Sequence, residues 1–211
     1  GQPTGALVAF HLVATDAAST PASSRFPNDA PGRECLVNFG EAQPYGSLGA
    51  YRIWMTQANI NEWNLREKNS NYPLDCTFAY GNSRVIYNAG TLYSGSPWHT
   101  PNYGGPLGSF PTDYELNFQG DERLLGSADF VLNSQTDYET FFAGDASAQN
   151  EDTAYWFGRK LGLGYNHKRI VRVFFNGQPR FMLYFDAQQP NNEIISEYFP
   201  NDNQGHLHKI E

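Results

Sequence analysis

The sequence has little charge, few basic residues and no long apolar run. Its 14 Lys and Arg residues face 22 Asp and Glu residues, which gives a net charge of −8 at pH 7. No run of Lys or Arg interrupts this acidic excess, so the cationic surface that binds a phosphate backbone is missing. No stretch approaches the ~18 to 20 consecutive apolar residues of a membrane span. We therefore expect neither a nucleic-acid partner nor a membrane-spanning helix.

Cysteine is also scarce, and the two present, Cys35 and Cys76, form no Cys-x-x-Cys pattern. They are either two buried free thiols or one disulfide, because spacing alone does not fix connectivity. The segment Gly1–Gly5 lacks the charged and apolar parts of a signal peptide, so any export signal has been removed or lies upstream. The low lysine content and the abundance of Tyr, Asn and Gly favour an extracytoplasmic protein, secreted or at the cell surface. We predict that Cys35 and Cys76 are bridged in the exported protein.

Apolar residues, in contrast, are plentiful. Hydrophobic residues make up 40% of the chain and aromatic residues 15%, which supports a sizeable core and excludes global disorder. Frequent Gly, Pro, Asn and Ser are typical of short strands joined by many turns. No linker-like stretch divides the chain, so we predict one domain over residues 1–211. Its expected fold class is α+β: a twisted mixed or antiparallel sheet with one main packed helix over residues 151–161.

This helix has clear boundary signals. Asn150 is the expected N-cap, acidic residues favour the positive helix start, basic residues favour its end, and Gly162 supplies a left-handed stop. Ala154, Phe157 and Leu161 share one face at i, i+3, i+7 spacing. We therefore expect the helix to pack on the sheet through this face.

The clearest strand signal is a hairpin. Residues 170–175 and 180–185 flank Asn176-Gly177, a pair that tolerates the positive φ angles of a type I′ turn, although Asn176 to Pro179 suggests a longer loop. A second compact hairpin is expected over residues 75–80 and 84–87. Further strands are expected over residues 6–13, 35–39, 49–55, 91–93, 114–118, 130–132 and 206–210, with short helices over 59–68 and 192–199 and a loop over 15–32. The last strand would continue past Glu211.

The expected core combines residues of these strands with two residues of the helix. It comprises Val8, Phe10, Leu12, Ile86, Phe118, Phe157, Leu161, Val171, Val173, Phe175 and Leu183.

Few residues form a recognisable catalytic or metal-binding pattern. His206 and His208 would share one strand face, but no third ligand and no HExxH motif accompany them, so solvated neighbours are favoured over a metal site. The carboxylates are scattered without the pairing of a glycosidase. Trp63, Trp98 and Tyr103 are core residues or, if exposed, could stack on sugar rings.

Four segments, in the same order, resemble the amino-terminal part of the CotH family. This is a spore-coat-type, kinase-like family of secreted bacterial proteins. The four segments are VIYNAGTLYSGSPW (85–98), YELNFQGDERLLG (114–126), EDTAYWFGRKLGLGYNHKRIVRVFFNG (151–177) and residues 184–209, which include DAQQPN and GHLHK. The resemblance implies an atypical protein-kinase-like fold. In the full-length parent, ATP with Mg or Mn would be held between two parts of that fold.

The resemblance also implies cofactor-binding residues, carried over position by position. Ser96 matches the family's Ser-Trp turn, Asp186 falls near its acidic residue, one position out of register, and Lys209 matches its terminal lysine. The family's Lys-Lys pair is replaced by Thr112-Asp113.

The family's catalytic Asp residues correspond to positions beyond Glu211, so no catalytic residue is assigned to this chain. The expected role is therefore nucleotide cradling in the parent without catalysis by the chain alone. The alternative is an extracellular surface-assembly or carbohydrate-recognition module without enzymatic activity, with surface proteins or glycans as partners.

Overall fold

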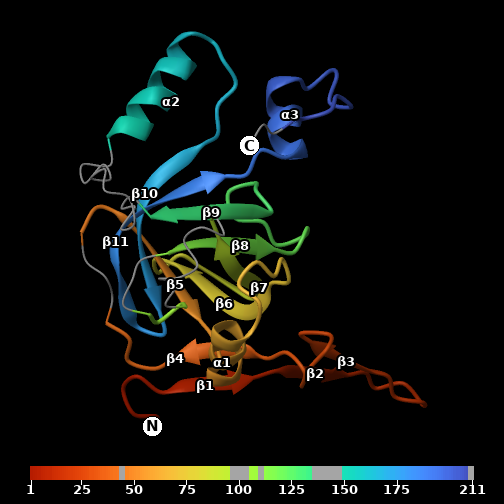
Figure 1. Ribbon diagram of the computed structural model, residues 1–211. Helices are drawn as coiled ribbons and strands as arrows, with labels where there is room; N and C mark the ends of the chain where they lie inside the picture. Colours follow the sequence, from red (N-terminus) through yellow and green to blue (C-terminus); the bar gives the residue numbers. More distant parts are fainter. Residues whose placement is uncertain (43–45, 96–104, 109–111, 135–148, 209–211) are drawn as a thin grey trace.

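The computed structural model describes residues 1–42, 46–95, 105–108, 112–134 and 149–208, and strands dominate them (Figure 1). Seven strands form the main body: β5 (Gly49–Trp54), β6 (Leu74–Tyr80), β7 (Arg84–Ser94), β8 (Asp113–Phe118), β9 (Asp129–Ser134), β10 (Lys168–Phe175) and β11 (Gln178–Gln188). They close into a barrel in the order β10-β11-β9-β8-β7-β6-β5. Six of these pairings are antiparallel, and the β5–β10 pairing that closes the barrel is parallel, with Gly49 opposite Val171 and Ile53 opposite Phe175.

Both expected hairpins are confirmed, as β6–β7 and β10–β11. The loop between β10 and β11 is shorter than expected. Phe175 pairs directly with Gln178, so Asn176 and Gly177 alone form the turn. Their φ angles, 47° and 79°, are both positive, as a type I′ turn requires. The expected four-residue loop is therefore wrong, because Pro179 takes its place in β11 opposite Phe174.

Aromatic side chains fill the barrel. Tyr51 and Phe78 meet edge to face with ring centres 5.0 Å apart, and Tyr114 packs against Phe175 at 4.8 Å. A barrel of seven or eight strands has an interior that side chains fill, so this body is a packed core. The helix expected over residues 59–68 is confirmed as α1 (Gln57–Leu65), which adds Trp63 to this core.

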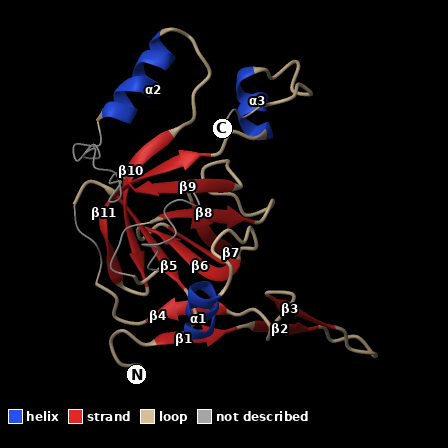
Figure 2. Cartoon of the chain, viewed as in Figure 1, coloured by secondary structure: helices blue, strands red, loops and turns tan. Residues whose placement is uncertain are grey.

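A small outer sheet covers part of the barrel. It pairs β1 (Leu7–Phe10) with β4 (Cys35–Asn38), and Leu36 packs against Trp54 and Ala79 on the barrel's outer face. The strand expected over 6–13 is interrupted, because β2 (Leu12–Thr15) leaves this sheet to pair with β3 (Ser23–Phe26), inside the expected loop. The β2–β3 ribbon is exposed along its whole length and projects from the body (Figure 2).

Two helices lie at one end of the barrel (Figure 1): α2 precedes the start of β10, and α3 follows the end of β11. The expected boundaries are confirmed for α2 (Asn150–Lys160) and for α3 (Asn192–Tyr198). Gly162, at φ 73°, provides the left-handed stop after α2. However, the N-cap is Gln149, and no residue of α2 is buried. The expectation that this helix packs on the sheet is therefore wrong.

The fold class is corrected accordingly. The protein is a closed, mostly antiparallel barrel with short peripheral helices, and the α+β, kinase-like sheet with one main packed helix is contradicted. Periodicity reveals strands, but it does not reveal that β5, the first barrel strand, pairs in parallel with β10, the next to last.

The expected core is partly confirmed. Ile86, Phe118, Val171, Val173 and Phe175 are buried. Val8 and Phe10 are half-buried in the outer sheet. Exposed residues among those expected inside are Leu12, Phe157, Leu161 and Leu183.

The two cysteines are free, buried thiols. Cys76 belongs to the barrel core, whereas Cys35 lies on β4 in the outer sheet. Burial raises the pKa of both thiols. The disulfide of the exported protein stays a prediction.

Candidate functional site

A cleft lies where the start of β10 and the end of β11 meet α3 and the β8–β9 turn. Its volume is about 490 Å³. Phe130 and Leu125 give it an apolar part, and charged side chains of both signs surround them. The lining residues are Leu125, Gly126, Ser127, Phe130, His167, Lys168, Arg169, Asp186, Gln188, Glu193 and Glu197. A cleft of this size and mixed lining is the default candidate for a binding site.

Asp186 is the one expected cofactor-binding residue in this cleft, and its carboxylate is fully engaged. Oδ1 accepts a hydrogen bond from the backbone N–H of Arg169 at 2.7 Å. Oδ2 accepts from Nε of Arg169 at 3.0 Å, from its Nη2 and from the Tyr51 hydroxyl. Burial raises the pKa of Asp186, and the hydrogen bonds from Arg169 and Tyr51 oppose that shift. This carboxylate connects β10 and β11 with Tyr51 of β5.

The other expected cofactor-binding residues, Ser96 and Lys209, lie outside the described residues. Of the expected sugar-stacking residues, Trp98 and Tyr103 also lie outside, and Trp63 is buried beneath α1. Asp113 is described at the start of β8, where it accepts hydrogen bonds from the amide and hydroxyl of Ser134.

Acidic residues of α3 form one wall of the cleft, and each has a partner. Glu197 lies 2.5 Å from Nε2 of His167. Glu193 accepts from Nη1 of Arg123 at 2.7 Å and from the Ser127 hydroxyl at 3.1 Å. These contacts tie α3 to the start of β10 and to the β8–β9 turn. These hydrogen bonds fix the position of the wall.

Lys168 forms the border between this cleft and α2. Its ammonium lies 4.0 Å from the ring centre of Phe185 and 4.3 Å from that of Tyr155, between two aromatic faces. Its Nζ is also 3.4 Å from Oε1 of Glu151, at the start of α2. Burial lowers the pKa of Lys168, and the nearby Glu151 carboxylate opposes that shift. Lys168 thus connects α2, which buries no residue of its own, to the barrel.

A second cleft, of about 210 Å³, opens on the other side of Lys168. It lies between α2 and the segment that leads into β10. Three aromatic rings, those of Tyr155, Trp156 and Tyr165, line it together with polar side chains. The remaining lining residues are Asp152, Arg159, Asn166, His167 and Lys168. Because His167 and Lys168 line both clefts, the two adjoin at this end of the barrel, and we refer to them together as the groove.

The aromatic rings of the second cleft are held in place by neighbours. Tyr165 packs edge to face on Tyr198 of α3, with ring centres 6.0 Å apart, and its carbonyl accepts from the Tyr198 hydroxyl at 3.1 Å. Asn166 donates to the carbonyl of Gln188 at 2.7 Å. The groove is therefore built by side chains from α2, α3 and the ends of β10 and β11. Sequence reasoning missed these residues. The feature of the sequence that could have indicated them is the run of polar and aromatic residues from Tyr165 to Arg169, ahead of an apolar strand.

His206 and His208 form no metal site with the rest of the described chain. Residues 206–208 are exposed and not in a strand, which corrects the expected strand start, and the two imidazole ring centres are 6.4 Å apart. Within the described ranges, no group of three or more His, Cys, Asp or Glu residues is placed to hold a metal ion.

Among the described residues, no helix has the length and apolar character needed to cross a membrane. No protein-family model matches the chain, and no curated protein matches its sequence. The resemblance to the CotH family therefore rests on the quoted motifs alone and stays a prediction.

Proposed function

We propose that the protein is a carbohydrate-recognition module that binds a glycan in the groove between α2 and α3. The observation that carries this proposal is the second cleft, where Tyr155, Trp156 and Tyr165 surround hydrogen-bonding side chains. Such rings offer apolar faces, and their indole or phenol groups add a polar edge. A sugar ring has the matching chemistry, because it presents C–H groups on its faces and hydroxyls around its rim.

The partly exposed rings are open to such a ligand. Trp156 is 51% exposed, and Tyr155 and Tyr165 are half-buried. Asp152 supplies acceptors, Arg159 supplies donors, and both line the same cleft. Further hydroxyls of a longer glycan would reach His167 and the first cleft. Affinity would come from several weak contacts along the groove.

Three carboxylates of the groove are engaged with partners, which favours binding over proton transfer. Asp186 is held by Arg169, Glu197 by His167 and Glu193 by Arg123. A general acid or base needs access to the proton that it transfers. Carboxylates engaged in contacts of this kind serve better to shape a site. We therefore propose no catalytic step for this chain.

Nucleotide cradling, which the CotH resemblance implies, is the competing function. Among the described residues, its support is reduced to Asp186, whose oxygens are occupied by Arg169 and Tyr51. ATP with Mg or Mn as cofactors of a longer parent stays a prediction. The extracytoplasmic location also stays a prediction, and it agrees with a glycan ligand.

The test is calorimetry of the purified chain against a panel of soluble polysaccharides and against ATP with Mg or Mn. We expect binding to at least one polysaccharide, and a roughly tenfold or greater loss of affinity in Trp156→Ala and in Asp152→Ala. The matched control is Tyr72→Ala, an exposed aromatic residue away from the groove, which should bind like the wild type.

Three outcomes would overturn the proposal. The first is the absence of polysaccharide binding, and the second is binding that survives Trp156→Ala. The third is saturable binding of ATP with Mg by a chain that ignores glycans, which would favour the nucleotide-cradling role. Circular dichroism of each variant establishes that a lost signal does not come from unfolding.

A further inference from the structure

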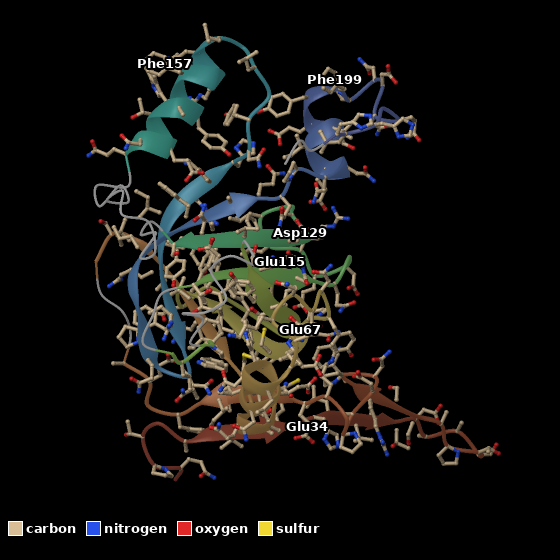
Figure 3. All side chains as sticks on the ribbon, in the orientation of Figure 1. Glu34, Glu67, Glu115, Asp129, Phe157 and Phe199 are labelled. Carbon is tan, nitrogen blue, oxygen red and sulfur yellow. The ribbon has the colours of Figure 1, made fainter. Side chains whose placement is uncertain are left out.

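The last turn of α2 and the chain beyond it expose an unusual amount of apolar surface. Phe157 is 56% exposed, Leu161 75% and Leu163 59%. Gly162 turns the backbone so that the N–H of Leu163 bonds to the carbonyl of Gly158 at 3.0 Å, which keeps Leu163 beside the last turn. We name these three residues the apolar tip. It stands clear of the barrel, at the end that also carries Phe199 of α3 (Figure 3).

The charge around the apolar tip differs from that of the whole molecule. From Thr153 to Arg169 the sequence contains no Asp or Glu, although the chain as a whole carries a net charge of −8. Arg159 and Lys160 end α2 directly beside the tip. Lys160 places its ammonium 5.5 Å from the ring centre of Trp156, on the flank of the same helix. Apolar residues with Trp and basic residues at their edge are typical of helices that lie in a lipid–water interface.

We infer that the apolar tip docks on the surface of an anionic lipid bilayer. Phe157, Leu161 and Leu163 enter the headgroup region, and Arg159 and Lys160 meet the negatively charged headgroups. Asp152 is exposed in the first turn of α2, at the opposite end of the helix from the tip. Two other acidic residues at this end of the barrel have partners, since Glu151 lies next to Lys168 and Glu197 next to His167. Their pairing limits repulsion from the lipid surface.

Charge decides between a bilayer and a second copy of the chain as the occupant. A two-fold dimer through this face would bring the Arg159 and Lys160 of both copies together, because the same patch meets itself across a two-fold axis. Like charges opposed in this way weaken association. An anionic bilayer complements both the cations and the apolar side chains. Trp156 and Arg159 also line the glycan cleft, but the two proposals are tested separately, because bilayer vesicles without glycolipid contain no sugar ligand.

The test is co-sedimentation of the full chain with phosphatidylcholine vesicles, with and without about a third of phosphatidylglycerol. We expect roughly tenfold or stronger partitioning into the anionic vesicles, decreasing as salt rises. The Leu161→Asn/Leu163→Asn double variant should lose about tenfold or more of this partitioning. Arg159→Gln/Lys160→Gln should lose the preference for anionic lipid. The matched control is Leu65→Asn, an 87% exposed leucine on α1, which should leave partitioning unchanged.

A second readout reports on the tip itself. Trp156 is exposed beside the tip, so its fluorescence should shift to shorter wavelength on vesicle binding, and Trp156→Phe should remove that shift. Absence of partitioning into either kind of vesicle would overturn the inference. So would equal partitioning of the Leu161→Asn/Leu163→Asn variant. Sedimentation velocity tests whether a second copy of the chain occupies the tip instead. Reversible dimers that disappear in the same double variant would assign the tip to a second copy and overturn the inference.

Discussion

Arg169 and Asp186 face each other across the β10–β11 ladder, and the aspartate accepts hydrogen bonds from both the backbone and the guanidinium of its partner. Tyr51 of β5 donates to the same carboxylate. One carboxylate thus links β10 and β11 to β5, on either side of the parallel closure of the barrel. The predicted contact of Asp186 with a nucleotide stays a prediction, and the structure shows that this carboxylate connects three strands.

Replacing Asp186 with alanine should therefore destabilise the barrel. The change leaves the Tyr51 hydroxyl and the Arg169 backbone amide without their acceptor, and it removes the partner of a half-buried cation. Breaking a buried ion pair costs about 3 to 5 kcal/mol, and we expect the lower end because Arg169 is partly exposed. Urea unfolding measures the loss. Asp202→Ala, at an exposed position, is the control and should change stability by less than about 0.5 kcal/mol.

Lys168→Met should release α2 while leaving the barrel folded. The methionine keeps an apolar stem between Phe185 and Tyr155, but it loses the attraction to both rings and to Glu151. Amide hydrogen exchange of residues 150–163 should become faster, and exchange in β10 and β11 should stay slow. Unchanged exchange in α2 would mean that other contacts hold the helix in place.

The same residue gives a pH dependence with a defined sign. Burial lowers the pKa of Lys168 from its ordinary value of 10.5, so in alkaline solution the folded chain releases this proton before the unfolded chain does. Stability rises with pH wherever the unfolded state binds more protons. The wild type should therefore gain stability relative to Lys168→Met as the pH rises towards 10.5. Unfolding curves of both proteins at a series of pH values test this, and a constant difference would contradict it.

Tyr114 should make the barrel sensitive to alkali. Burial raises the pKa of its phenol from 10.0 to about 12, so the folded chain keeps a proton that the unfolded chain has lost. The resulting stability is present below pH 10 and is lost as the pH rises to 12, by about 2 to 3 kcal/mol. Tyr114→Phe should show a smaller loss over this interval. The variant should be less stable than the wild type at neutral pH, because it lacks the hydroxyl that accepts a hydrogen bond from Nε of Arg180. The alkaline loss of each protein is therefore measured from its own stability at neutral pH.

The thiols provide a test of the disulfide. As free, buried groups whose pKa values are raised by burial, Cys35 and Cys76 should resist a thiol reagent in the folded chain and react after unfolding. Mass spectrometry of protein from an oxidising compartment checks the alternative. A mass lower by about two daltons, with no reaction after unfolding, would show that the bridge forms on export.

Local patterns predicted the local structure well. Asn176-Gly177 fixed the last hairpin, because few residues other than Gly and Asn accept two successive positive φ angles. The closure of the barrel was not predictable in the same way. Strand β5 pairs with β10 across more than half of the chain, and nothing in either strand names its partner.

The helix over residues 150–160 shows the limit of periodicity. Ala154, Phe157 and Leu161 share one face as expected, but an apolar face indicates only that something covers it, not which surface does so. The candidate groove was hidden for a related reason. Tyr155, Trp156 and Tyr165 come together only because Lys168 fixes α2 over the start of β10, and that contact depends on the completed fold.

The parallel closure also bears on how the protein emerges from the ribosome. Strands β5 to β9 form a simple meander of neighbours, and they can pair as soon as each is synthesised. Until the β10–β11 hairpin follows, this meander is an open sheet with unpaired edges at β5 and β9, and such edges recruit other chains. The last hairpin occupies both edges at once. A nascent chain arrested before Lys168 is thus the aggregation-prone species during synthesis. Once β10 and β11 have been synthesised and have paired with β5 and β9, the sheet has no free edge.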